Sequence, residues 1–298
     1  MSESGVLRLG TRGSPLATTQ SQTIADALSA QTGRPVELVI IRAEGDDVRV
    51  PLHTPKRPGV FVATLRDALL DANVDLVVHS FKDLPSAPLP GAVVAAIPTR
   101  ADPRDALCAR DGLQLDELPA GARVGTSSPR RAAALLRARP DLEIVPIRGN
   151  VETRLGKVTN GEVSAAVLAA AGLTRLGHEA AITQWLDPQL MVPAPAQGAL
   201  AVECRTGTLE AALAGLDHLP TRLAVTAERA VLQGVQAACT TAVGAHAQWI
   251  SPTELLLVAE LSDHQGIDYA RVSHQARVTD PLEAEVLGVR VAEELLAG

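Results

Sequence analysis

The chain has 298 residues and a formal net charge of −7, which results from 34 acidic and 27 basic side chains. Five residues are aromatic, so the chain lacks both the basic field and the stacking surfaces of a nucleic-acid-binding protein. An apolar content of 46% excludes a disordered chain, and no apolar run reaches the roughly 18–20 residues that a membrane span needs.

The cysteines and the N-terminus indicate a reducing compartment. Cys108, Cys204 and Cys239 are far apart and odd in number, which argues against a disulfide framework and against a structural zinc site. Residues 1–5 lack the basic and apolar regions of a signal peptide. We therefore expect a cytoplasmic protein without a metal.

The first part of the chain alternates short apolar strands with helices. Ser14 and Pro15 are a good N-cap and a good first helical residue for the first helix. The predicted elements are a strand at 6–9, a helix at 16–28, a strand at 36–41, a proline-broken loop at 44–58, a helix at 60–70 and a strand at 76–78.

The same order of strand, Gly-Thr and Ser-Pro turn, helix, strand, helix and strand is predicted again further on. This second set comprises a strand at 122–124, a helix at 130–137, a strand at 143–147, a helix at 151–159 and a strand at 165–168. Alternation of this kind predicts two similar doubly wound α/β units with parallel sheets.

The remainder of the chain reads differently. A proline-rich linker is predicted at 193–195, and the segment from about 219 alternates less regularly. A helix at 221–232, strands at 255–258 and 270–272, and a helix at 283–296 predict a separate small α+β domain.

Both Ser-Pro turns place hydroxyl groups and free backbone N–H groups at the start of a helix, where the helix dipole attracts anions. A simple N-cap is the alternative interpretation of either turn. The second turn also carries Arg130 and Arg131 at the first helical positions, where two cations are unfavourable. An anionic ligand at that position would explain them.

The charge distribution agrees with an anion site in the middle of the chain. Residues 120–180 carry a net charge of +4, whereas residues 219–298 carry −5. A guanidinium group binds carboxylate or phosphate through two parallel hydrogen bonds. Arginine is also the default surface cation here, since 24 of the 27 basic residues are arginine. Six arginines fall at predicted strand ends or helix starts: Arg12, Arg130, Arg131, Arg148, Arg154 and Arg175.

Two further positions have an open interpretation. Lys82, one of three lysines, follows a predicted buried strand and precedes Asp83. Asp83 is either a general acid or cation-stabilising carboxylate, or only a turn or cap residue. Cys239 lies in a small-residue turn after a helix, where a thiol is either inert and buried or reactive.

Eight stretches in a fixed order resemble the porphobilinogen deaminase family, also called hydroxymethylbilane synthases. The resemblance extends from Arg8 to about residue 296. The matching stretches lie at 11–17, 78–85 (Val-His-Ser-Phe-Lys-Asp-Leu-Pro), 102–106, 124–131 (Val-Gly-Thr-Ser-Ser-Pro-Arg-Arg), 148–155, 171–177, 197–205 and 226–229.

This resemblance implies three domains: residues 1–99 with 198–216, residues 104–193, and residues 219–298. The first two would be similar α/β units that face each other across a cleft, as in two-lobed binding proteins. The third would carry the cofactor cysteine. The family condenses four porphobilinogen molecules head to tail, with release of ammonia, on a covalent dipyrromethane cofactor. The product is hydroxymethylbilane, a precursor in tetrapyrrole biosynthesis.

The resemblance also assigns roles to residues. Asp83 would be the catalytic carboxylate, which helps to protonate the departing amine and stabilises the azafulvenium cation. The cofactor would be bound by Cys239 as a thioether and by Ser80, Lys82, Asp83, Thr126, Ser127, Ser128, Arg130, Arg131, Arg148 and Gly149. The substrate would be bound by Arg12, Ser14, Phe61, Arg148, Arg154, Arg175 and Gln197.

Each pyrrole carries an acetate and a propionate, so an arginine-lined site matches a growing polyanion. Two regions depart from the family pattern. The Cys239 loop reads Ala-Ala-Cys-Thr-Thr-Ala, and the loop at 44–62 has Thr54 and Pro58 where the family has lysines, although Phe61 is retained. The family pattern implies a monomer. The alternative function is a two-lobed anion-binding protein without catalysis.

Overall fold

The computed structural model describes residues 5–42, 60–235, 242–263 and 265–297, so the predicted loop at 44–58 lies outside the described residues. The chain forms two compact units. Unit 1 comprises residues 1–100 and 199–221, and unit 2 comprises residues 101–198 and 222–298. Among the described helices, none is long and apolar enough to cross a membrane.

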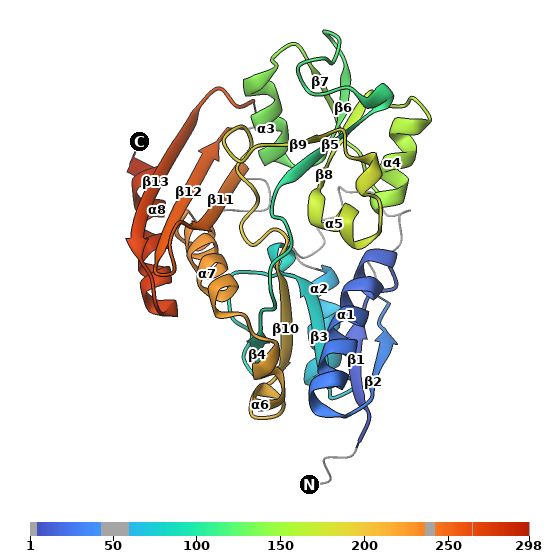
Figure 1. Ribbon diagram of the computed structural model, residues 1–298, viewed down its shortest axis with the longest axis vertical. Coiled ribbons are helices and arrows are strands. Elements are labelled where there is room, and N and C mark those ends of the chain that lie inside the picture. Colours follow the sequence, from blue (N-terminus) through green and yellow to red (C-terminus); the bar gives the residue numbers. More distant parts are fainter. Residues whose placement is uncertain (1–4, 43–59, 236–241, 264, 298) are drawn as a thin grey trace. The chain divides into compact units, whose positions relative to one another are not determined.

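Unit 1 is built on a five-stranded sheet with the order β2-β1-β3-β10-β4 (Figure 1). The first three of these strands are parallel, and β10 runs antiparallel to β3 and β4. The elements are β1 (Leu7–Thr11), α1 (Pro15–Thr32), β2 (Val36–Ile40), α2 (Val60–Leu70), β3 (Leu76–Ser80), the 3-10 helix η2 (Phe81–Asp83), β4 (Ala92–Ala96), β10 (Leu200–Arg205), α6 (Glu210–Leu213) and η5 (Ala214–Leu216).

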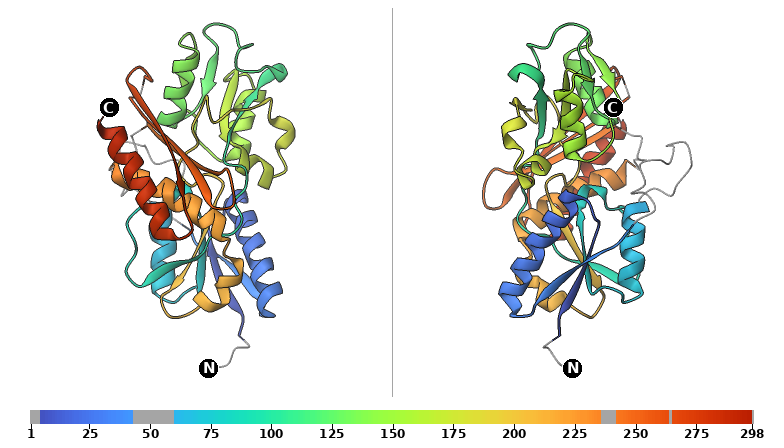
Figure 2. Two further views of the ribbon diagram at one scale, coloured as in Figure 1. Left: turned by 60° about the vertical axis from the view of Figure 1, so that its left-hand side comes forward. Right: turned by 90° about the vertical axis from the view of Figure 1, so that its right-hand side faces the viewer.

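Helices cover both faces of this sheet, as the right-hand view of Figure 2 shows for α1 and α2. Ile24 and Leu28 of α1 pack on Leu76 and Val78, whereas α2 packs on the other face around Val77. Successive residues of a strand point to opposite faces, so a strand covered on both sides is apolar throughout. This explains why 76–78 is a continuous apolar run.

Unit 2 repeats this plan in a sheet with the order β7-β6-β8-β5-β9. Strands β6, β7 and β8 are parallel, and β5 is antiparallel to β8 and β9. The elements are β5 (Asp105–Ala109), η3 (Arg110–Gly112), β6 (Arg123–Gly125), α3 (Pro129–Ala138), β7 (Glu143–Val145), α4 (Val151–Thr159), β8 (Ala165–Ala169), α5 (Ala170–Arg175), η4 (Glu179–Ala181) and β9 (Gln184–Trp185).

Helices again lie on both faces of the sheet. Leu135 of α3 packs with Val124 and Val167 on one face. On the other face, Val158 of α4 packs on Ala166, and Leu173 of α5 packs on Leu168. The structure therefore confirms the prediction of two similar doubly wound α/β units. The prediction of parallel sheets is wrong, because each sheet is mixed: β10 and β5 run antiparallel to both of their neighbours.

A three-stranded antiparallel sheet completes unit 2. Its apolar face is covered by two helices, which share one core with it around Val231, Leu257 and Val291. The elements are α7 (Leu219–Gly234), β11 (Ala242–Trp249), β12 (Glu254–Ser262), β13 (Tyr269–Arg277) and α8 (Pro281–Ala297). The predicted small α+β segment is thus confirmed, while its separation from residues 104–193 as a domain of its own stays a prediction.

A buried cluster of charged side chains joins α2 to the sheet of unit 1. Arg66 donates to both carboxylate oxygens of Glu203, at 2.9 and 2.7 Å, and His79 Nε2 lies 3.0 Å from Glu203 Oε2. Burial by itself raises the pKa of Glu203. The hydrogen bonds and charges of His79 and Arg66 outweigh burial and lower the pKa to about 2.

This cluster predicts a loss of stability in acid. Because the pKa of Glu203 is lower in the folded chain than in the unfolded one, its contribution is complete above the unfolded value of 4.5. That contribution is lost progressively as the pH falls toward about 2. Urea unfolding at several pH values should show this dependence, and the variant Glu203→Gln should show less of it.

The same variant should be less stable than the wild type by about 3 kcal/mol near neutral pH, because it leaves a buried guanidinium group without its partner charge. An identical pH dependence of unfolding in Glu203→Gln and wild type would contradict this account.

Candidate active site

The strand directions bring the predicted site residues to one edge of each sheet. In unit 1 the carboxyl ends of β1, β2 and β3 lie beside the amino end of β10, where Ser80 pairs with Leu200. In unit 2 the carboxyl ends of β6, β7 and β8 lie beside the amino end of β5, where Ala169 pairs with Asp105. Ligands of open α/β sheets bind at this carboxyl edge.

The first turn of unit 1 positions Arg12 and Ser14. Ser14 caps α1 and accepts a hydrogen bond from the Ala17 N–H at 3.4 Å, as predicted, so its own O–H stays available for a ligand. Thr11 lies beneath this turn and is fully buried. Its hydroxyl donates to the Ala17 carbonyl at 3.1 Å and accepts from Ser21 at 2.8 Å. Arg12 is half-buried directly after β1.

The end of β3 carries Ser80, Lys82 and Asp83. Ser80 exchanges hydrogen bonds with the amide of Gln20 on α1, at 3.1 and 3.2 Å. Lys82 and Asp83 follow in η2, where Lys82 is half-buried and Asp83 is exposed. Within the part of the chain that the structure describes, no hydrogen bond or ion pair engages the Asp83 carboxylate. Asp83 therefore caps no described helix with its side chain, whereas its place in η2 leaves the interpretation as a turn residue open.

The corresponding turn of unit 2 has one residue fewer and uses its hydroxyl groups differently. Ser127 donates to the Ile147 carbonyl at 2.7 Å. Thr126 accepts from the Ser128 N–H at 3.2 Å, and Ser128 caps α3 by accepting from the Arg131 N–H at 3.5 Å. Ser127 thus stabilises the turn with its own O–H, whereas the O–H of Ser128 stays available to donate to a ligand.

Arg130 and Arg131 are both buried against Asp105, a residue that the sequence did not single out. Asp105 Oδ2 lies 2.7 Å from Arg130 Nη1, and Asp105 Oδ1 lies 2.8 Å from Arg131 Nη2. We expected an anionic ligand to explain two cations at a helix start. The structure shows that an internal carboxylate balances one of the two charges, so the pair retains a single net positive charge.

The turn after β7 supplies the next group. Arg148 is exposed, and its guanidinium group makes no hydrogen bond or ion pair with any residue described in the structure. Arg154 on α4 donates to the Gly149 carbonyl at 2.8 Å. Burial and then the charge of Arg131 lower the pKa of Arg154. Arg131, Arg148 and Arg154 therefore belong to one cationic edge.

Gln197 and Arg175 bind segments of unit 2 that are distant in sequence. The amide of Gln197 donates to Asp105 Oδ1 at 2.9 Å and to the Pro103 carbonyl at 2.7 Å. Arg175 donates to the Gly198 carbonyl at 2.7 Å, and burial lowers its pKa. Gln197 is 1% exposed, so its amide supports other groups in this conformation.

Two predicted residues have no described side-chain environment. Cys239 lies outside the described residues, and Phe61 lies in the first turn of α2 with a side chain outside the description. The other two cysteines are buried and unpaired. Burial raises the pKa of Cys108 to about 12 and also raises the pKa of Cys204, which makes both thiols poor nucleophiles.

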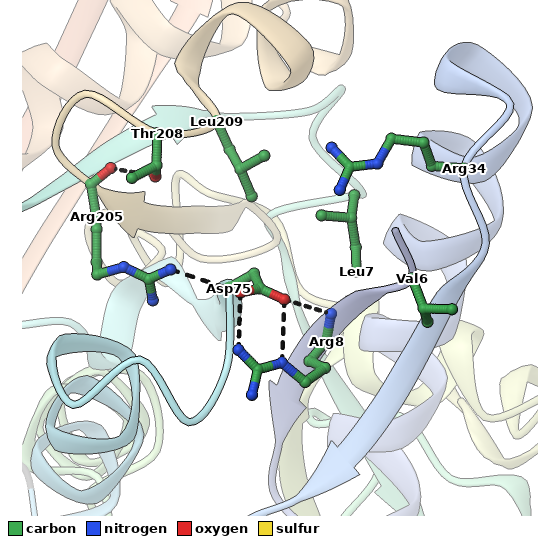
Figure 3. Close-up of a pocket in the computed structure, with 8 residues that line it drawn as sticks. All are labelled: Val6, Leu7, Arg8, Arg34, Asp75, Arg205, Thr208 and Leu209. Atoms are coloured by element: carbon green, nitrogen blue, oxygen red, sulfur yellow. Dashed lines mark hydrogen bonds and ion pairs between the residues drawn. The ribbon is translucent and has the colours of Figure 1, made fainter. Parts of the chain in front are cut away.

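A second feature of unit 1 lies at the opposite edge of the sheet. This pocket of ≈ 290 Å³ is lined by residues that include Arg8, Arg34, Asp75 and Arg205 (Figure 3). Arg8 and Arg205 both point at Asp75, with Arg8 Nη2 3.0 Å and Arg205 Nη2 3.5 Å from its Oδ1. Asp75 thus binds two of the three arginines that line this pocket, and none of the site residues predicted from the sequence lines it, so this edge is not the candidate site.

Fold and site together define an α/β protein of two doubly wound units, one with an exposed carboxylate and the other with a cationic group at its carboxyl edge. Two family models match the chain: "Porphobilinogen deaminase, dipyromethane cofactor binding domain" at residues 7–212 and "Porphobilinogen deaminase, C-terminal domain" at residues 222–297.

Curated relatives agree. The porphobilinogen deaminase of Thermobifida fusca is 51% identical over 97% of this chain and 92% of its own length, and that of Nocardia farcinica is 52% identical over 97% and 85%. The chain belongs to the porphobilinogen deaminase family of transferases. Among solved structures, the periplasmic VFT2 domain of Bordetella pertussis BvgS has a TM-score of 0.40 and 16% identity over 70% of this chain and 83% of its own, too low to bear on function.

The turn that carries Arg148 depends on Gly149. Its φ of +107° is unfavourable for any side chain, and a Cβ there would lie 2.6 Å from Thr153 Cγ2. Gly149→Ala should therefore reduce the free energy of unfolding by about 1–3 kcal/mol in urea denaturation.

Gly156 in the interior of α4 provides the control, because a Cβ there would meet nothing within 4 Å. Gly156→Ala should be neutral or stabilising by up to about 1 kcal/mol. Equal effects of the two substitutions would show that the turn tolerates a side chain.

Proposed function

We propose that this chain condenses four porphobilinogen molecules head to tail, with release of ammonia, on a dipyrromethane cofactor bound to Cys239. The product is hydroxymethylbilane. The exposed carboxylate of Asp83 at the end of β3, with no polar partner among the described residues, is the observation that carries the catalytic proposal. Family membership favours it over a binding protein without catalysis.

The donor groups of unit 2 suit the cofactor and the growing chain. Arg130, Arg131, Arg148 and Arg154 bring four guanidinium groups to this edge, and the carboxylate of Asp105 pairs with the first two of them. Acetate and propionate groups of pyrroles accept two-pronged hydrogen bonds from guanidinium groups. Ser128, capped onto α3, would add one O–H donor.

In unit 1 we assign Asp83 a role in catalysis and assign Lys82, Arg12 and Ser14 a role in binding the carboxylates of the substrate. The Asp83 carboxylate would accept hydrogen bonds from pyrrole N–H groups and stabilise the positive charge that develops as the C–N bond to ammonia breaks. It would also take up the proton that the ring carbon loses when the new C–C bond forms. Lys82 would neutralise substrate carboxylates beside it, and Arg12 and Ser14 would fix further carboxylate oxygens.

When bound, the cofactor supplies the pyrrole carbon to which the first substrate unit is joined. The residues of this chain bind the acidic side chains and hold the reacting carbon near Asp83. When the cofactor and the substrate are both bound in a fixed geometry, a reaction between oriented groups replaces a bimolecular encounter in water.

We further propose that the protein acts as a cytoplasmic monomer on porphobilinogen and not on nucleic acid or membranes. The buried, unpaired thiols of Cys108 and Cys204 support a reducing compartment. The negative net charge and the scarcity of aromatic residues support the exclusion of nucleic acid.

Intact-protein mass spectrometry tests the covalent attachment. The wild-type protein should exceed its sequence mass by two pyrrole units, and Cys239→Ser should abolish the addition because it removes the sulfur that forms the thioether. Cys108→Ala should retain the full addition, since its buried thiol takes no part. An active wild-type protein at its bare sequence mass would overturn the assignment.

The catalytic role of Asp83 is tested by Asp83→Asn, which removes the negative charge with little change in shape. Turnover should fall by roughly 100-fold or more, because a charge that acts on the transition state is lost. The added mass and the melting temperature should stay unchanged, since the exposed carboxylate makes no hydrogen bond or ion pair with the residues that the structure describes. Asp71→Asn, at another exposed position of unit 1, serves as control. Equal turnover in both variants would remove Asp83 from the mechanism.

A further inference from the structure

Asp105 is a buried carboxylate at the cationic edge for which the proposed reaction has no direct use. It is the first residue of β5 and is 0% exposed. Three side chains converge on it: Arg130 at 2.7 Å, Arg131 with Nη2 at 2.8 Å and Nε at 3.0 Å, and Gln197 at 2.9 Å. A group so enclosed does not contact a ligand in this conformation, so any effect that it has must act through its neighbours.

The carboxylate stays ionised in this environment. Burial by itself raises the pKa of Asp105, but the charges of Arg130 and Arg131 lower it well below the usual range of a carboxyl group. Two adjacent guanidinium groups at the start of α3 repel each other and are opposed by the helix dipole. The carboxylate of Asp105 offsets this repulsion because its negative charge balances one of the two positive charges.

Each oxygen of Asp105 has a defined partner. Oδ2 faces Arg130, whereas Oδ1 faces both Arg131 and Gln197. The two arginines are also bound from the other side, since Arg130 donates to the Val192 carbonyl at 2.7 Å and Arg131 donates to the Val167 carbonyl at 3.0 Å. Both guanidinium planes are therefore fixed before any ligand arrives.

We infer that Asp105 is a positioning residue that fixes the Arg130 and Arg131 guanidinium groups and limits the net charge of the three groups to +1. The two arginines then recognise pyrrole carboxylates through hydrogen bonds of fixed direction and not through undirected electrostatic attraction. This inference rests on the proposed function. It predicts that substrate binding depends on both the charge and the exact place of a residue that never touches the substrate.

Asp105→Asn and Asp105→Glu separate charge from placement. Asn keeps the shape, but its amide must point N–H groups at a guanidinium group or at Gln197, and the arginine pair then carries two net charges. Glu keeps the negative charge but moves it by one methylene. Glu203→Gln is the matched control, because Glu203 is also a buried carboxylate bound by an arginine and lies in unit 1.

The experiment measures the KM and kcat for porphobilinogen over a range of sodium chloride concentrations, with intact mass and melting temperature for each variant. Asp105→Asn should raise KM about tenfold and make KM depend more steeply on salt, because undirected attraction replaces directed hydrogen bonds. Asp105→Glu should raise KM about threefold, with the salt dependence of the wild type. Glu203→Gln should lower the melting temperature but leave KM and its salt dependence unchanged.

Equal changes of KM and of its salt dependence in Asp105→Asn and Glu203→Gln, or an unchanged KM in Asp105→Asn, would overturn the inference and make Asp105 a structural residue only. If Asp105→Asn yields no folded protein, Asp105→Glu decides, and an unchanged KM then counts against positioning. If the wild type does not consume porphobilinogen, the proposed function fails. The inference is then tested with citrate as a carboxylate probe in calorimetry, where Asp105→Asn should bind it about tenfold more weakly than Glu203→Gln does.

Discussion

Charged groups can be buried in this protein because each buried carboxylate meets its partners within hydrogen-bond distance. In unit 2 the carboxylate of Asp105 pairs with Arg130 and Arg131. In unit 1 the carboxylate of Glu203 pairs with Arg66 and His79. An isolated charge in such a place would carry a large desolvation penalty. The pairing allows arginines to lie at the base of a sheet edge with fixed orientation, and the cationic edge of unit 2 depends on it.

Two sheets of the same topology support two different kinds of edge. The strand orders β2-β1-β3-β10-β4 and β7-β6-β8-β5-β9 match position by position, and a Ser-capped helix follows the second strand in each order, β1 or β6. Unit 1 ends its third parallel strand in an exposed carboxylate, whereas unit 2 surrounds its edge with guanidinium groups. The repeated fold thus presents an exposed carboxylate in unit 1 and a group of guanidinium groups in unit 2 on equivalent scaffolds.

Much of this was predictable from local sequence, because its signals are local. The helices at 60–70 and 151–159 have the predicted bounds, and the Ser14 cap forms as expected. Ser128 caps its helix too, which was the alternative interpretation of the second Ser-Pro turn. Strands β5 and β10 were missed as elements, since they join the sheets through antiparallel pairing with strands distant in sequence. The pairing of Asp105 with Arg130 and Arg131 could not be predicted for the same reason, although Asp105 lies in the matching stretch at 102–106. The engagement of Ser127 and Gln197 by protein groups also depends on tertiary contacts that spacing does not encode.

The central claim is that these edges serve the condensation of porphobilinogen and not merely its binding. Because each new bond releases one amine, the ammonia formed by the purified protein with porphobilinogen is the direct measure of chemistry. The account predicts one ammonia molecule for every porphobilinogen molecule consumed. It also predicts that ammonia release continues after the amount of porphobilinogen consumed exceeds the amount that the enzyme can bind. Binding of porphobilinogen without ammonia would contradict it and would identify an anion-binding protein instead.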